Sequence, residues 1–129
     1  MDKPELLRAK TELMRFMVES PAFYKDLLDL IAKHADTYFL VKGFSVRMST
    51  LFKLMVYPMI KKVHCDNQTR QIIEQDIRNL ASKHIYDYRT FVEIIKKCAK
   101  SYGIGYCALA EMIAAGHLSS SNGGDTNVF

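Results

Sequence analysis

The stretch that decides the fold is residues 95–116, which read IKKCAKSYGIGYCALAEMIAAG. Apolar residues at helical spacing predict a helix in the first part, and Gly103 stands where a helix ends in a left-handed residue. A second, short helix is predicted over residues 106–115, ended by Gly116. The small side chain of Ala99 lets the two helices cross closely. The stretch therefore predicts two helices joined by a glycine-centred corner.

This corner resembles the helix-turn-helix of Cro-type phage repressors. The positions that carry the resemblance are Ala99, Lys100, Gly103, Ile104, Ala108, Ile113, Ala115 and Gly116. It covers residues 95–116, and the rest of the chain is not recognised. The resemblance implies a DNA-binding protein whose second helix enters the major groove.

The resemblance also implies which side chains meet DNA. The positions that would face base edges are Tyr106, Cys107, Ala110 and Glu111. Of these, only Tyr106 and Glu111 offer a side chain that hydrogen-bonds to a base. Lys96, Lys97 and Lys100 flank the first helix and are the expected phosphate contacts. The alternative is a helix corner with no nucleic-acid role.

Upstream of this corner, the first half of the chain carries further helical signals. Residues 5–19 have the apolar spacing of an amphipathic helix. Ser20 followed by Pro21 is a typical helix start, so a second helix is expected through about residue 35. A third helix is predicted from Ser49 or Thr50, with a kink at Pro58.

Two more helices are expected between this third helix and the corner. Asp66 and Asn67 predict a stop and a new N-cap, followed by a fourth helix to about Lys83. Asp87 is the expected N-cap of a fifth helix, the one that leads into the corner. Residues 38–48 are ambiguous, because their apolar run and alternation fit either a short β-hairpin or an irregular buried loop.

Length and composition indicate one domain. The chain has 129 residues, of which 49% are apolar and 25% charged, as in ordinary globular domains. We therefore predict a mostly all-α fold of five to six helices in a single domain over residues 1–118. The serine- and glycine-rich residues 119–129 are expected to form a flexible tail. We identify no internal repeat.

The net charge of +4 is unevenly distributed. Residues 37–65 contain five cations and no acid, and these cations are Lys42, Arg47, Lys53, Lys61 and Lys62. Such a segment favours contact with phosphates or with an acidic protein face. The alternative is that these cations solvate the outside of an apolar segment.

Nothing in the sequence indicates catalysis. The three cysteines are widely spaced with no C-x-x-C pair, and the four histidines are far apart. We therefore predict that the protein is not an enzyme and has no cofactor or metal site. Free thiols and methionines are typical of a reducing interior, so a cytoplasmic location is expected. No stretch is apolar enough for a transmembrane helix.

Two functions fit these observations. The first is a small DNA-binding protein, a dimeric transcriptional regulator whose partners are duplex DNA and a second copy. The alternative is a non-enzymatic protein-interaction module, such as an adaptor, inhibitor or secretion-system component, whose methionines line an adaptable groove. Membrane association through residues 38–62 is not expected, because Pro58 and Gly43 interrupt an amphipathic helix there.

Overall fold

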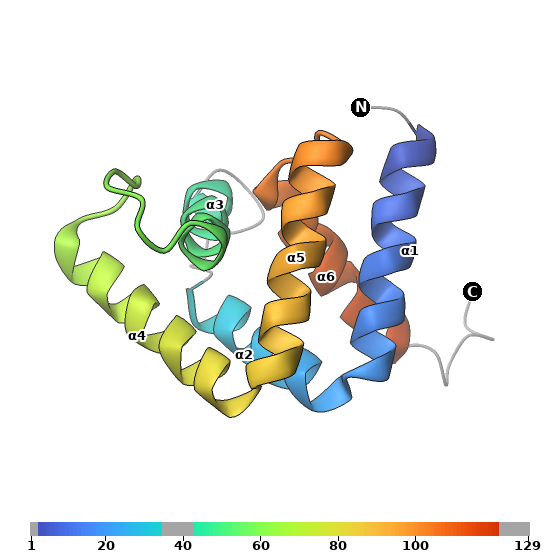
Figure 1. Ribbon diagram of the computed structural model, residues 1–129, viewed down its shortest axis with the longest axis horizontal. Helices are drawn as coiled ribbons and strands as arrows, with labels where there is room; N and C mark the ends of the chain where they lie inside the picture. Colours follow the sequence, from blue (N-terminus) through green and yellow to red (C-terminus); the bar gives the residue numbers. More distant parts are fainter. Residues whose placement is uncertain (1–2, 35–42, 122–129) are drawn as a thin grey trace.

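Helices build the whole of the fold in the parts of the chain that the computed structural model describes, residues 3–34 and 43–121. Six helices lie there, and no strand occurs among these residues (Figure 1). They are α1 (Lys3–Glu19), α2 (Pro21–His34), α3 (Gly43–Val56), α4 (Asn67–Lys83), α5 (Ile85–Ser101) and α6 (Tyr106–Ser121). The predicted all-α class is confirmed.

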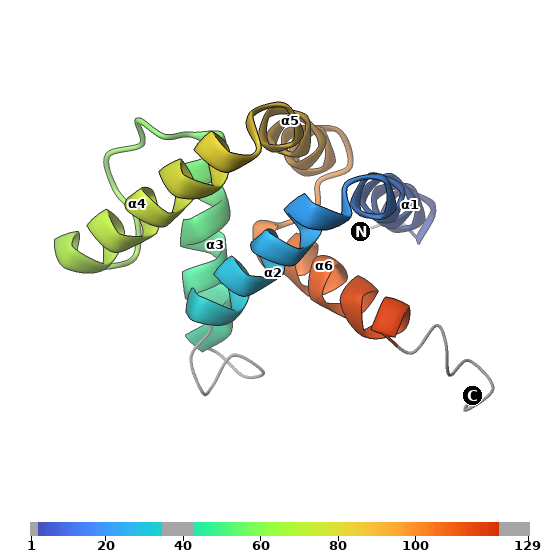
Figure 2. The same cartoon turned by 90° about the horizontal axis from the view of Figure 1, so that it is seen from below.

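The last helix, α6, lies at the centre of the bundle. It packs most extensively against α3 and also contacts α1, α2 and α5, which surround it (Figure 2). Leu109, Ala110 and Ile113 have no exposed surface. A helix with apolar or small side chains nearly all round is stable only when other elements cover it. The hydroxyl of Tyr24 on α2 donates to the buried carbonyl of Ile113 at 2.6 Å and fixes α6 against α2.

Four phenylalanines, one each from α1, α2, α3 and α5, pack against one another in the core and join these helices. Phe91 of α5 is fully buried and lies 5.3 Å from the ring of Phe23 on α2, measured between centroids. Phe16 of α1 stacks on Phe91, and Phe52 of α3 meets it edge-on. Each aromatic pair adds about 0.5–1.5 kcal/mol to the area it buries. One side chain of α5 therefore holds three other helices together.

Two matching ion clusters clamp α2 to α4. On one side, Asp76 of α4 accepts from Nε2 of His34 at 2.7 Å and lies 2.9 Å from Nζ of Lys33. On the other, Asp26 of α2 accepts from Nε2 of His84 at 2.7 Å and lies 2.9 Å from Nζ of Lys83. Because the earlier residue of α2, Asp26, pairs with the end of α4, and the later residue, His34, pairs with the earlier Asp76, the two helices are antiparallel.

The two clamps are built from matching residue types at matching spacings. Residues 26–34 read DLLDLIAKH, and residues 76–84, which lie 50 residues farther along, read DIRNLASKH. Aspartate, leucine, lysine and histidine recur at the same places. Each copy supplies the carboxylate to one cluster and the cations to the other, which gives the pair a local two-fold symmetry.

Several predicted features agree with the structure. Asp66 caps α4, its Oδ1 accepting from the backbone N–H of Thr69 at 2.7 Å. Gly103 has a φ of 67° and ends α5, where the N–H of Ile104 turns back to the carbonyl of Cys98. A glycine is needed there because other residues are strained at positive φ.

Other predictions about the middle of the chain are wrong. Residues 43–48 are the first turns of α3 and not a strand, because a short apolar run also fits helical spacing; residues 38–42 lie outside the described residues. The helix ends at Val56 without a kink, since the position before Pro58 disfavours helical geometry. His84, not Asp87, stands at the N-cap of α5, since α4 and α5 meet at that one residue.

The end of the chain also differs from expectation. Gly116 does not stop α6, which continues to Ser121. A glycine inside a helix costs about 1 kcal/mol relative to alanine, and it is tolerated where the helix is otherwise well packed. Residues 119–121 of the predicted tail are therefore helical, and residues 122–129 lie outside the described part of the chain.

The clamps predict a dependence of stability on acid. The hydrogen bonds from His84 and Lys83 lower the pKa of Asp26. Burial alone would raise the pKa of Asp76, but the hydrogen bonds from Lys33 and His34 outweigh it and lower that pKa as well. Ionised carboxylates therefore stabilise the fold at neutral pH, and this contribution is lost as pH falls below about 4.

We expect Asp26→Asn and Asp76→Asn each to lower the free energy of urea unfolding at pH 7 by about 1–3 kcal/mol. In each variant, the free energy of unfolding should also fall less between pH 5 and pH 3 than it does in the native protein. Asp29→Asn is the matched control on α2, because the Asp29–Lys25 pair is exposed and such pairs contribute about 0.5 kcal/mol or less. Equal losses in Asp29→Asn and Asp26→Asn would contradict the clamp.

Candidate functional site

The predicted helix corner exists, but its second helix buries one face, with Leu109, Ala110 and Ile113, in the core. Ala110 has no exposed surface, so the prediction that it faces a base is wrong. Tyr106 and Cys107 are half-buried, and the Tyr106 ring packs edge-on against Phe52. Among the four predicted base-facing residues, Glu111 is the exposed one. The cause is composition, because an apolar helix with one acid finds more stabilisation in the core than on a surface.

The lysines predicted to contact phosphates on α5 are partly engaged by carboxylates. Nζ of Lys97 lies 2.6 Å from Glu12 of α1, whose hydrogen bond and charge raise the pKa of Lys97. Lys96 is 4.0 Å from Glu93. Lys100 is exposed and makes no ion pair with another described residue. Two of the three cations are thus already paired within the fold.

The cations of the basic middle segment lie elsewhere. Lys53 is half-buried near the end of α3, and Lys61 and Lys62 are exposed on the connection to α4. The side chain of Arg47 and all of Lys42 lie outside the described residues. In both ribbon views this connection is on the far side of α3 from α5 (Figures 1 and 2). Of the described members of the basic middle segment, Lys61 and Lys62 therefore lie on the other side of α3 from the lysines of α5.

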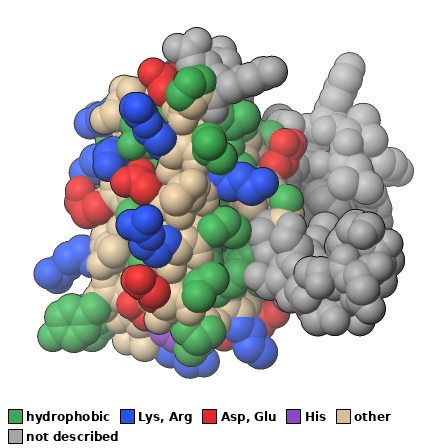
Figure 3. Space-filling model, turned by 90° about the vertical axis from the view of Figure 1, so that its right-hand side faces the viewer, with side chains coloured by type: hydrophobic (Ala, Val, Ile, Leu, Met, Phe, Trp, Pro, Cys, Tyr) green, Lys and Arg blue, Asp and Glu red, His purple; other side chains and the backbone are tan. Residues whose placement is uncertain are grey.

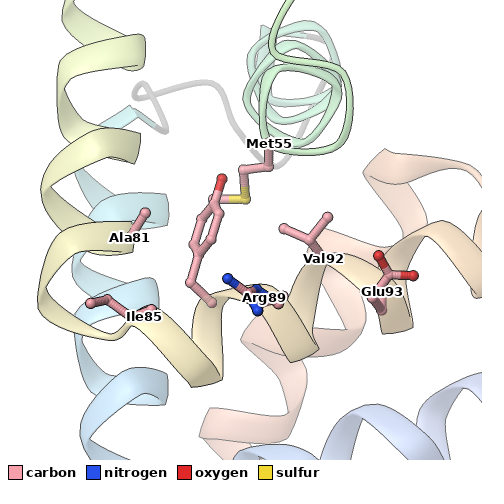
Figure 4. Close-up of a pocket in the computed structure, with 7 residues that line it drawn as sticks. Met55, Ala81, Ile85, Arg89, Val92 and Glu93 are labelled. Atoms are coloured by element: carbon pink, nitrogen blue, oxygen red, sulfur yellow. The ribbon is translucent and has the colours of Figure 1, made fainter.

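A hollow of about 300 Å³ opens between α3, α4 and α5 (Figure 4). Its lining is mostly apolar, with one hydroxyl and two charged side chains. The lining residues are Met55, Ala81, Ile85, Tyr88, Arg89, Val92 and Glu93. The size is at the lower end of ligand pockets and suits one large side chain of a partner.

The hollow follows from how α5 begins. Ile85, Tyr88, Arg89 and Val92 recur at helical spacing and form one side of α5, while Phe91 on the other side enters the core. Since α4 ends where α5 starts, the two helices diverge from this joint, and Met55 of α3 lies at the floor. This second stripe is readable in the sequence, but the wider apolar face of α5 obscured it.

The polar groups of the hollow are suited to binding. Burial raises the pKa of Tyr88 to about 12, so its hydroxyl remains protonated at neutral pH. Arg89 is exposed and forms no ion pair with any residue in the described parts of the chain. The hollow therefore offers a neutral hydroxyl and a guanidinium whose five donors are available to a carboxylate.

The lining lacks the side chains of the common serine and cysteine nucleophile sites. It contains no cysteine, histidine, serine, threonine or aspartate. A nucleophile needs a base within hydrogen-bond reach. Cys98 is buried in the core, and this burial raises the pKa of its thiol to about 11. Within residues 3–34 and 43–121, no three histidine, cysteine or acidic residues are grouped to hold a metal ion.

The methionines do not line one groove as the interaction hypothesis supposed. Met17 and Met55 belong to the core, and Met14 and Met112 are half-buried against it. Met59 is 88% exposed on the connection between α3 and α4. Among the methionines whose side chains the structure describes, Met55 alone lines the hollow, so the candidate site depends on Tyr88 and Arg89 instead.

Comparison with known proteins gives no match: no protein-family model, no curated protein and no solved structure is similar to this chain. The Cro-type resemblance of residues 95–116 stays a prediction. None of the described helices combines the length and the apolarity that crossing a membrane requires.

The burial of one face of α6 predicts that substitutions at the adjacent positions 110 and 111 have different effects on the free energy of unfolding. Ala110→Leu should lower the free energy of unfolding by about 1–3 kcal/mol, because the core has no room for the larger side chain. Glu111→Leu, the same replacement on the exposed side, should change it by about 0.5 kcal/mol or less. Chemical denaturation measures both. Similar small effects at the two positions would show that α6 is not the centre of the fold.

Proposed function

We propose that the protein is a non-enzymatic protein-interaction module that binds a segment of a partner protein in the hollow between α3, α4 and α5. The observation that carries this proposal is the position of Arg89, whose guanidinium makes no ion pair with a described residue and lies at an apolar hollow that already contains the hydroxyl of Tyr88. Arginine and tyrosine beside an apolar pocket are the residues that dominate binding energy in protein interfaces.

The surroundings of the hollow extend this surface. Ile85 is 57% exposed at its edge, and the neighbouring Tyr86 is 81% exposed. A helix of the partner lying along α5 would insert one apolar side chain over Met55 and cover Ile85. A carboxylate of the partner would bind Arg89, and a polar group beside it would bond to the Tyr88 hydroxyl.

The positions of the residues predicted to meet DNA support this choice over a transcriptional regulator. The second helix of the corner is covered by four other helices, and Lys97 and Lys96 lie beside carboxylates. A helix that reads bases must protrude from its domain to enter the major groove. The burial of Ala110 and the paired lysines argue against the predicted DNA-binding surface, and DNA binding becomes an outcome of the test.

A library of helical peptides displayed on phage can be selected for binding to the full chain. We expect the selection to enrich peptides that carry a large apolar residue and an acidic residue one helical turn away. Arg89→Glu and Ile85→Asp should each weaken the selected peptides at least about tenfold, since each removes a central contact. Fluorescence anisotropy with the synthetic peptide measures this.

Arg78→Glu is the control, because Arg78 is an exposed arginine of α4 that does not line the hollow. Circular dichroism of each variant establishes that it is folded. Peptides that bind Arg89→Glu as well as the native chain would rule out the hollow. Binding of random duplex DNA at low salt that is lost on Lys96→Glu and Lys100→Glu would favour the regulator instead.

A further inference from the structure

The first helix carries two apolar rows, and only one of them is in the core. Ala9, Leu13, Phe16 and Met17 form the buried row. A second row on the other side consists of Leu7, Thr11, Met14 and Val18. Leu7 is 64% exposed and Val18 is 73% exposed, while Met14, the third apolar member of this outer row, is half-buried and also packs against the core. A surface helix needs one apolar row, so the outer row is not explained by folding.

The spacing of the outer row is that of a coiled-coil seam. Residues 7, 11, 14 and 18 are separated by four, three and four positions, the alternation of a and d sites in a heptad. The row spans roughly 16 Å of helix at 1.5 Å per residue. Thr11 belongs to it despite its hydroxyl, because Oγ1 donates to the carbonyl of Leu7 at 2.8 Å. Its polar group is thus bonded within α1 and does not need water.

The row is accessible at the edge of the bundle. The helix α1 is the outermost element on the right-hand side of the molecule in Figure 1. Figure 3 faces that side, and hydrophobic side chains lie there among lysine and arginine side chains.

Cations flank the row on both sides. Arg8 and Arg15 each come one residue after a row member, and Lys10 comes one residue before Thr11. All three side chains are exposed and form no ion pair with a described residue. These are the e and g positions, whose charges select the partner of a coiled-coil helix. The acids of α1 lie farther from the seam, and Glu12 among them is bound to Lys97.

We propose that the outer row of α1, Leu7, Thr11, Met14 and Val18, binds an amphipathic helix of a partner protein that carries acidic residues beside its own apolar row. Complementary charge is the observation that identifies this partner. The surface is distinct from the hollow beside α5, and this inference does not depend on the proposed function.

The flanking charges disfavour a second copy of this chain as the occupant. In an antiparallel pair, Arg8 of one copy would face Arg15 of the other. In a parallel pair, Lys10 would face Arg15. Like charges at these positions act against self-association, so this row does not support the predicted homodimer. A lipid surface is disfavoured because helices that lie on membranes present a broad apolar face, whereas this row is one residue wide.

The test uses two designed helical peptides of 21 residues that share leucines at their a and d positions. One peptide carries glutamate at e and g, and the other carries lysine. By fluorescence anisotropy with the full chain at low salt, we expect the glutamate peptide to bind at least about tenfold more tightly than the lysine peptide. Val18→Asp and Leu7→Asp should each remove this binding, and Arg8→Glu with Arg15→Glu should reverse the preference.

Arg89→Glu is the matched control, because it alters the hollow and leaves α1 unchanged; it should have no effect on either peptide. Since all the substituted α1 side chains are exposed, circular dichroism should show native helix content in each variant. Equal binding of the two peptides, or full binding by Val18→Asp, would overturn the proposal. Dimerisation of the native chain in sedimentation equilibrium would also overturn the proposal if Val18→Asp abolished it. The same holds for flotation of the native chain with vesicles of phosphatidylcholine and phosphatidylserine if Val18→Asp abolished it.

Discussion

The need to cover most of α6 constrains the whole molecule. This helix has one charged residue, the exposed Glu111, between Tyr106 and Ala115, so only a narrow side of it is suited to water. Gly103 turns the chain so that α6 passes back under α5 and contacts α1, α2 and α3 as well. The bundle is therefore arranged around its last helix, and the surfaces left for other molecules belong to the helices outside it.

The clamp between α2 and α4 determines where one of those surfaces lies. His84 is the residue at which α4 ends and α5 begins, and its ring is bound to Asp26. Fixing this joint against α2 sets the angle at which α4 and α5 separate, and the hollow occupies the space between them. The matching aspartate and lysine–histidine pairs of α2 and α4 thus connect the core to the candidate site.

Local signals in the sequence were sufficient for most of the fold. Asp66 and Gly103 each act through one backbone geometry, a cap and a left-handed turn, so their effects are readable without tertiary structure. The start of α3 was not predictable in this way, because residues 43–48 fit strand and helix alike. Gly116 misled because the preference of glycine against helices, about 1 kcal/mol, is too weak to end a helix by itself.

The candidate sites were harder to predict because they depend on which face of a helix the rest of the chain leaves uncovered. The apolar row of Leu7 and Val18 and the stripe of Ile85 and Val92 are visible in the sequence, but core packing is the usual role of such rows.

The central position of α6 in the core is tested most directly by hydrogen exchange of its backbone amides. We predict that the amides of Leu109, Ala110 and Ile113 exchange only through global unfolding, with the full free energy of unfolding. Exchange of these amides at the rate of exposed helix ends, well before global unfolding, would contradict this account.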